Sequence, residues 1–143
     1  MILLDTNVIS EPLKLSADAD AGVLAWIDAQ SIATLYLSAI SLAELRFSIA
    51  ALPTGKRKET LQLGLEQRIL PLFADRILPF DAIASQAYAD ILSTARAQGR
   101  AISTADGYIA ATAKCHGFMV ATRDASPFEA AGVAVINPWT VQH

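Results

Sequence analysis

The sequence predicts an α/β fold built on a central, mainly parallel sheet. Short apolar runs of strand type alternate with longer segments of helical periodicity along the whole chain. Strands that are separated by helices pair in parallel, and helices then cover both faces of the sheet. The chain has 143 residues and no linker, internal repeat or low-complexity tract, so we expect a single domain over residues 1–143.

The first half of the chain contains two expected strands and two expected helices. Residues 2–4 (Ile-Leu-Leu) form a short run of buried type, and residues 34–37 (Thr-Leu-Tyr-Leu) form the second. Apolar residues at helical spacing predict a helix over 23–29. A further helix is expected over 41–52, where Pro53 stops it.

The middle of the chain is expected to be helical on both sides of a short strand. An apolar stripe predicts a helix over 58–73, which Pro71 either kinks or stops early. Residues 76–80 read as a strand. The clearest helix spans 81–97, where alanine and isoleucine recur every four residues and Asp81 is a suitable N-cap.

The last third repeats the pattern. We expect a helix over 104–116, stopped by Gly117, and then strands over 118–122 and 133–136. In open parallel sheets the ligand site lies beyond the carboxyl ends of the strands, and this rule indicates where to look for chemistry.

Four acidic residues occupy positions that converge on this edge. Asp5 directly follows the first expected strand, and Asp124 follows a later one. Glu44 and Asp106 each lie in the first turn of an expected helix. Helices that follow parallel strands start near the same sheet edge, so the four carboxylates are expected to lie close together. Asp5 could also cap a following helix, because aspartate is a preferred N-cap.

Each of the other acids has a local structural alternative. The segment from Ser41 to Glu44 matches a capping box, in which Glu44 accepts a backbone N–H. With Thr104 as N-cap, Asp106 would only favour the positive end of its helix. Asp124 precedes Ala-Ser-Pro and could serve turn formation. The joint arrangement of four acids carries more weight than any one of them.

A cluster of carboxylates requires a counter-charge. Two like charges about 4 Å apart repel by roughly 4 kcal/mol at an effective dielectric constant near 20. A divalent cation removes this repulsion, and oxygen-only ligands suit Mg²⁺ or Mn²⁺. Such a cation can activate water and stabilise a leaving oxygen, which points to phosphodiester hydrolysis. Neither His116, near a helix end, nor the terminal His143 is required.

Four segments in order resemble the motifs of PIN-domain nucleases, and among them the VapC toxins of bacterial toxin–antitoxin pairs. A single motif of this kind is weak evidence, whereas four in order at these intervals are strong evidence. The resemblance covers about residues 1–139. Its main segments are 2–7 (Ile-Leu-Leu-Asp-Thr-Asn), 41–45 (Ser-Leu-Ala-Glu-Leu), 104–106 (Thr-Ala-Asp) and 122–124 (Thr-Arg-Asp), joined by the less specific 76–81, 106–113 and 137–139.

The resemblance implies an α/β/α sandwich and an endoribonuclease that depends on Mg²⁺ or Mn²⁺. It also implies a homodimer, bound by a cognate antitoxin that occludes the acidic pocket and alone contacts operator DNA. The core acids and metal ligands would be Asp5, Glu44 and Asp106, with Asp124 as the fourth. Hydrogen bonds from Thr6, Asn7 and Thr122 would support them.

Basic residues are scarce outside one short run. Lys56, Arg57 and Lys58 could contact RNA phosphates, although such a run is also typical of a solvated loop. Arg46 could hold a phosphate or pair with a neighbouring acid.

Two other functions fit parts of the sequence. A haloacid-dehalogenase-like phosphatase also begins with a strand that ends in aspartate, but it needs a second aspartate where this chain has Asn7. A non-enzymatic alternative is a regulatory partner, or co-repressor, of a DNA-binding antitoxin, with weak or no nuclease activity.

The net charge of −3 and the 53% hydrophobic content bear on which partners this chain can have. A negative chain is a poor general partner for nucleic acid, but the four candidate acids account for −4, and the remainder is +1. Only 17% of residues are charged, which favours a surface that is partly covered by a partner. No stretch is long and apolar enough to cross a membrane and no secretory signal is recognised, so a cytoplasmic location is expected.

Overall fold

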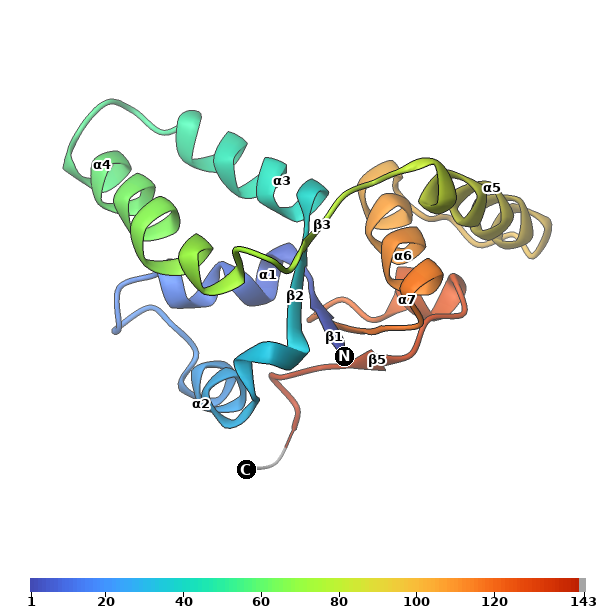
Figure 1. Ribbon diagram of the computed structural model, residues 1–143, viewed down its shortest axis with the longest axis horizontal. Helices are drawn as coiled ribbons and strands as arrows, with labels where there is room; N and C mark the ends of the chain where they lie inside the picture. Colours follow the sequence, from blue (N-terminus) through green and yellow to red (C-terminus); the bar gives the residue numbers. More distant parts are fainter. Residues whose placement is uncertain (142–143) are drawn as a thin grey trace.

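Five parallel strands and seven α-helices make up the fold in the computed structural model, which describes residues 1–141 (Figure 1). The strands are β1 (Ile2–Leu4), β2 (Leu35–Ser38), β3 (Ile77–Leu78), β4 (Met119–Ala121) and β5 (Val135–Ile136). The helices are α1 (Thr6–Ile9), α2 (Ala21–Ala29), α3 (Ala39–Ala50), α4 (Lys56–Leu63), α5 (Ala82–Ala97), α6 (Thr104–His116) and α7 (Ser126–Ala130).

The sheet has the strand order β3-β2-β1-β4-β5, so β1 lies at its centre. Leu4 is in register with Leu37 of β2 on one side and with Ala121 of β4 on the other. All strand pairs are parallel, and the expected parallel sheet is therefore confirmed. Because β1, β2 and β4 end together, the residues that follow them meet at one edge.

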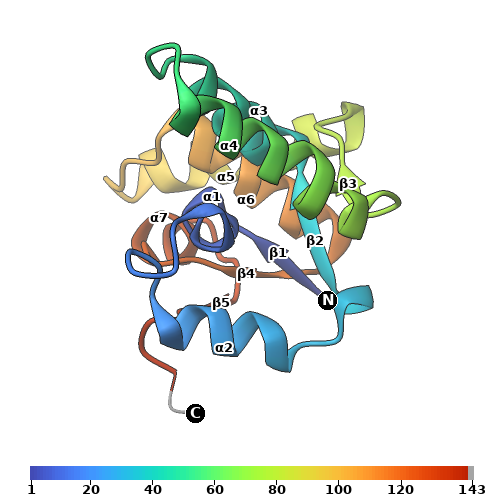
Figure 2. The ribbon, with the colours of Figure 1, turned by 90° about the vertical axis from the view of Figure 1, so that its left-hand side faces the viewer.

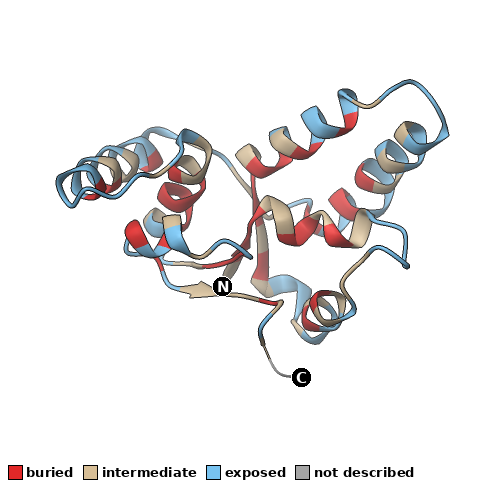
Figure 3. Ribbon diagram, turned by 180° about the vertical axis from the view of Figure 1, so that it is seen from behind, coloured by how far each residue is buried: buried red, intermediate tan, exposed pale blue. Residues whose placement is uncertain are grey.

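Helices cover both faces of the sheet, which gives an α/β/α sandwich (Figures 1 and 2). Leu4 points into a core that it shares with α1, α2, α3 and the segment 65–73. Leu3 points to the other face, into a core shared with α5, α6 and α7. This alternation follows from the two-residue period of a strand, and Figure 3 shows that buried residues line the sheet and the inward sides of the helices.

Helix starts differ from the expectation in two places. The N-cap of α3 is Ser38, whose Oγ accepts the Ser41 N–H at 2.9 Å, so the expected cap at Ser41 is wrong. The N-cap of α6 is Ser103 rather than Thr104. In both cases the residue nearer the preceding segment has the extended backbone that an N-cap requires.

The expected helix over 58–73 is not continuous. Helix α4 is followed by a π-helical segment, Gly64–Ile69, and by a 3₁₀ turn, Leu70–Phe73. Pro71 lacks the N–H that an α-helix would need there, which accounts for the change at the end of the segment. Strands β3, β4 and β5 are also shorter than expected, and the short helices α1 and α7 were not expected.

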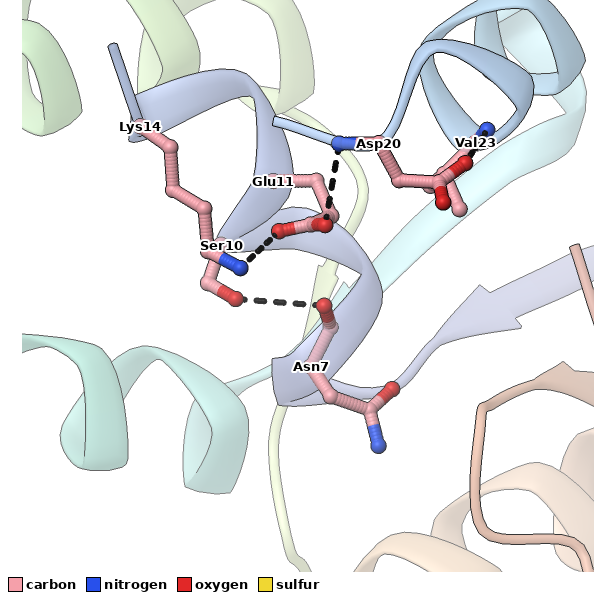
Figure 4. A network of polar contacts seen from close by, with 6 residues as sticks. All are labelled: Asn7, Ser10, Glu11, Lys14, Asp20 and Val23. Atoms are coloured by element: carbon pink, nitrogen blue, oxygen red, sulfur yellow. Dashed lines mark hydrogen bonds and ion pairs between the residues drawn. The ribbon is translucent and has the colours of Figure 1, made fainter. Parts of the chain in front are cut away.

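A buried glutamate in the 3₁₀ turn Glu11–Leu13, which follows α1, contacts the loop before α2 (Figure 4). Glu11 is 2% exposed, and its Oε1 accepts the Asp20 N–H at 3.3 Å. Its Oε2 pairs with the Lys14 ammonium, while Asp20 in turn caps α2 by accepting the Val23 N–H at 2.9 Å. The loop between residues 14 and 20 is thereby held against the 3₁₀ turn that follows α1.

Candidate active site

Asp5 lies at the centre of the sheet edge, directly after β1, and is 6% exposed. It caps α1, since Oδ1 accepts the Thr6 N–H at 2.8 Å. Its Oδ2 accepts the Thr122 hydroxyl at 2.8 Å. Capping alone would need only one carboxylate oxygen, whereas here both oxygens are held by neighbours.

Glu44 lies in α3 and faces the same group. It is the sixth residue of a helix that starts at Ala39, so the capping-box alternative, which needs the third position, is excluded. Its Oε1 accepts the Thr6 hydroxyl at 2.7 Å. Thr6 therefore donates its N–H to Asp5 and its hydroxyl to Glu44, and it joins two acids that come from separate elements.

Asp106 is the third residue of α6, and its N–H donates to Ser103 Oγ at 3.2 Å. Its carboxylate is half-buried and accepts no hydrogen bond from residues 1–141. Asp106 lies near enough to Asp5 for its negative charge to raise the pKa of Asp5. The charge of Glu44 acts in the same direction.

Asp124 contacts the other site residues through its backbone and not through its side chain. Its N–H donates to Thr122 Oγ at 3.1 Å, while its side chain is exposed. The side chain makes no hydrogen bond within the described part of the chain. The structure therefore brings Asp5, Glu44 and Asp106 together and leaves the Asp124 carboxylate at the rim.

The Thr122 hydroxyl forms hydrogen bonds with three other residues of the site. It is fully buried, donates to Asp5, and accepts from the Asn7 amide at 3.5 Å and from the Asp124 N–H. Asn7 Oδ1 also accepts the Arg123 N–H at 3.3 Å. These contacts tie α1 to the segment that follows β4.

Burial dominates the electrostatics of Asp5. Desolvation raises its pKa from 3.8 to about 6, and the charges of Asp106 and Glu44 add to the rise. The hydrogen bonds from Thr122 and Thr6 oppose it. Within residues 1–141 no basic side chain pairs with these acids, since the ion pairs found join Lys14 to Glu11 and Arg46 to Glu66.

The donor set suits a hard divalent cation. It offers carboxylate and hydroxyl oxygens and neither imidazole nor thiolate. The raised pKa of Asp5 reflects its burial first, and the nearby charges of Asp106 and Glu44 add to it. Among residues 1–141 no three His, Cys, Asp or Glu side chains form a ready-made cage. Mg²⁺ does not require one, because it binds one or two carboxylates and keeps several waters.

The other residues singled out in the sequence lie away from the acids. Lys56, Arg57 and Lys58 begin α4, and the Lys58 ammonium donates to the carbonyl of Ala50 at the far end of α3. That carbonyl is about 9 Å along the helix axis from Glu44. These three residues contact none of the four acids.

Arg46 and the histidines have different positions. Arg46 pairs with Glu66 through Nε at 2.9 Å and Nη2 at 3.0 Å, so of its two expected roles the structure shows the pairing with an acid. His116 ends α6 and lies about 15 Å along the axis from Asp106. His143 is outside the described residues.

Sequence reasoning missed a contact at the rim of the site. Asn137 follows β5, and its amide donates to the Arg123 carbonyl at 3.4 Å. Its Oδ1 accepts the Trp139 N–H at 2.9 Å, and the Arg123 guanidinium carbon lies 5.1 Å from the centre of the Trp139 ring. The Asn-Pro-Trp segment is recognisable in the sequence. Nothing in that segment indicates that its partner is Arg123.

Comparison with known proteins identifies the family of the chain. A profile of the PIN domain matches residues 2–133, and the chain belongs to the PIN-domain family. It is 63% identical to VapC ribonuclease Y4jK of Sinorhizobium fredii over 97% of this chain and 98% of that protein. It is 57% identical to Toxin FitB of Neisseria gonorrhoeae over 97% of this chain and 99% of that protein.

A solved structure shows the same fold at high similarity. The structure of FitAB bound to an IR36 DNA fragment matches with a TM-score of 0.94 and 55% identity, over 100% of this chain and 99% of that one. Within residues 1–141, no helix is long and apolar enough to span a bilayer.

Proposed function

We propose that this chain is a metal-dependent endoribonuclease, the toxin of a type II toxin–antitoxin pair, which hydrolyses RNA phosphodiesters at Asp5, Glu44, Asp106 and Asp124. The observation that carries the proposal is the buried Asp5 carboxyl, which has Glu44 and Asp106 nearby and no basic partner among residues 1–141. Such a group is most stable with a divalent cation beside it, and Mg²⁺ or Mn²⁺ suits its oxygen ligands.

The residues of the chain divide the work. Asp5 and Glu44 are held by Thr6, and Asp5 is also held by Thr122, so two carboxylates are oriented before substrate arrives. Asp106 adds negative charge from α6, and Asp124 adds a carboxylate at the rim. A bound Mg²⁺ or Mn²⁺ supplies Lewis-acid stabilisation of the departing oxygen and a water of lowered pKa.

The proposed partners follow from the relatives. One relative is named Toxin FitB, and the FitAB structure includes DNA. We therefore propose a homodimer in the cytoplasm that binds a cognate antitoxin, with operator DNA contacted only through that antitoxin. The run Lys56, Arg57 and Lys58, which contacts none of the acids, is proposed to meet RNA phosphates outside the cleavage site.

Induced expression tests the proposal in cells. Growth should stop, and sequencing of RNA ends should show new cleavage sites at one recurring sequence or structure. Asp5→Asn is the matched control, because it removes one charge with little change of shape. Growth arrest with equal RNA cleavage by Asp5→Asn would refute the nuclease assignment.

A second candidate is a co-repressor with weak nuclease activity. The DNA in the FitAB structure favours it, since that assembly engages DNA. Antitoxin alone and antitoxin with this chain should then bind operator DNA differently, and Asp5→Asn should keep this effect. Operator affinity that does not change when the chain is omitted would refute the co-repressor role.

A further inference from the structure

We propose that Arg123 binds an RNA phosphate at the rim of the carboxylate site, held in position by the ring of Trp139. This inference rests on the proposed function and adds a specific substrate contact. Its starting point is the order of three consecutive residues: Thr122 bonds to Asp5, Asp124 carries the rim carboxylate, and Arg123 lies between them.

Two hydrogen bonds from separate segments hold the backbone of Arg123. Its N–H donates to Asn7 Oδ1 at 3.3 Å, and its carbonyl accepts from the Asn137 amide at 3.4 Å. One of these partners belongs to α1 and the other follows β5. The residue is therefore held by elements on both sides of the strand that precedes it, although its side chain is exposed.

The guanidinium is exposed and has no acidic partner in the part of the chain described. The ion pairs there are Lys14 with Glu11 and Arg46 with Glu66, even though Arg123 is adjacent in sequence to Asp124. Its carbon lies instead 5.1 Å from the centre of the Trp139 ring. An arginine that stacks on an aromatic face keeps its in-plane N–H groups available for an acceptor.

The charge of the site explains why a cation is needed there. The four acids bring −4 to one sheet edge, which repels an approaching phosphate. A bound divalent cation offsets only part of that charge. A guanidinium at the rim attracts the backbone, and its forked geometry fits two phosphate oxygens at once. Arg46, by contrast, already pairs with Glu66, so its guanidinium is less available than that of Arg123.

The test measures RNA binding apart from cleavage. A fluorescein-labelled single-stranded RNA of mixed sequence is titrated with the full chain carrying Asp5→Asn, in Mg²⁺ buffer at 50 to 200 mM KCl. Adding Arg123→Ala should weaken binding about tenfold, the worth of one charged hydrogen-bonded contact. The slope of log affinity against log salt should fall by about 0.7, the value for one phosphate on a single strand.

Two variants complete the design. Arg123→Lys keeps the charge and should restore the salt slope but only part of the affinity, because lysine lacks the planar fork. Lys114→Ala is the control: it removes one exposed cation near the end of α6, in a hollow lined also by Met1 and Met119 at the amino edge of the sheet, and should change neither quantity. Circular dichroism is expected to show the same fold for all, because the backbone bonds of Arg123 remain.

The outcomes separate this inference from the proposed function. RNA binding that is equal for Arg123→Ala and Lys114→Ala, in a chain that cleaves RNA, would overturn the role of Arg123 alone. A chain that neither binds nor cleaves RNA would refute the proposed function itself. If Arg123→Ala weakens binding of the antitoxin but leaves RNA binding intact, the contact belongs to a protein partner and the RNA assignment is wrong.

Discussion

The Thr122 hydroxyl donates a 2.8 Å hydrogen bond to Oδ2 of Asp5, between residues 117 positions apart. Both side chains are buried, and each follows a strand of the same parallel pair. The bond opposes the rise that burial imposes on the pKa of Asp5. It therefore favours the charged carboxylate that a metal-dependent site requires.

Replacing Thr122 with valine should show how much this hydrogen bond contributes to stability and to the pKa of Asp5. Thr122→Val removes the donor and leaves a buried carboxylate oxygen unsatisfied, so the free energy of unfolding should fall by about 1–3 kcal/mol. The pKa of Asp5 should rise further. Thr122→Ser keeps the hydroxyl and is the matched control. Urea denaturation and carboxyl-carbon NMR measure the two quantities, and a valine variant equal to wild type in both would contradict the assignment.

The raised pKa of Asp5 predicts how stability depends on pH without metal. The folded state holds the proton up to about pH 6 and the unfolded state only to about 3.8, so folding is favoured by protonation. This contribution, roughly 3 kcal/mol, is complete below pH 4 and lost as pH rises through 6. In EDTA, Asp5→Asn should therefore gain stability relative to wild type between pH 4 and 7. A difference between the two proteins that is independent of pH would contradict this.

Metal binding should offset the free-energy cost of ionising the buried Asp5 carboxyl. Mg²⁺ or Mn²⁺ binds the charged carboxylate of the folded state, so it should raise the melting temperature, and more at pH 7.5 than at pH 5. Asp5→Asn should lose most of the increase, whereas Lys114→Ala, at the opposite edge of the sheet, should retain it. Calorimetry with and without metal provides the measurement. An equal increase in Asp5→Asn would place the metal elsewhere.

The ion pair between buried Glu11 and exposed Lys14 gives a prediction outside the site. Lys14→Met leaves the Glu11 carboxylate buried without its counter-charge and should cost about 1–2 kcal/mol, a reduced value because Lys14 is half exposed. Adding Glu11→Gln should recover part of this loss, since glutamine still accepts the Asp20 N–H. Chemical denaturation of both single variants and the double variant measures the coupling, and strictly additive losses would contradict it.

The sheet edge and its acids were predictable because the signals are local. An acid that directly follows a buried run, as Asp5 does, must lie at the carboxyl edge of a parallel sheet. The caps of α3 and α6 were misplaced because each true cap has a second capping residue close behind it: Ser41 after Ser38, and Thr104 after Ser103. Composition cannot choose between two residues that both cap well.

The contacts between distant segments were beyond the sequence. Thr6 bonds to Glu44 across 38 positions, and Asn137 bonds to Arg123 across 14. Such pairs depend on how side chains lie after the helices have packed, and no spacing rule encodes them. For the same reason, the burial of Glu11 became evident only once its partners had positions.

RNA cleavage by the purified chain tests the central claim most directly. A labelled RNA that contains a site mapped in cells is incubated with wild type, Asp5→Asn and Asp106→Asn, each in EDTA, Mg²⁺ and Mn²⁺. Wild type should cleave only with metal, and each variant should be slower by at least about 100-fold, as expected when an electrostatic contribution to the transition state is lost. Cleavage that persists in EDTA, or that proceeds equally in Asp5→Asn, would contradict a metal-dependent carboxylate site.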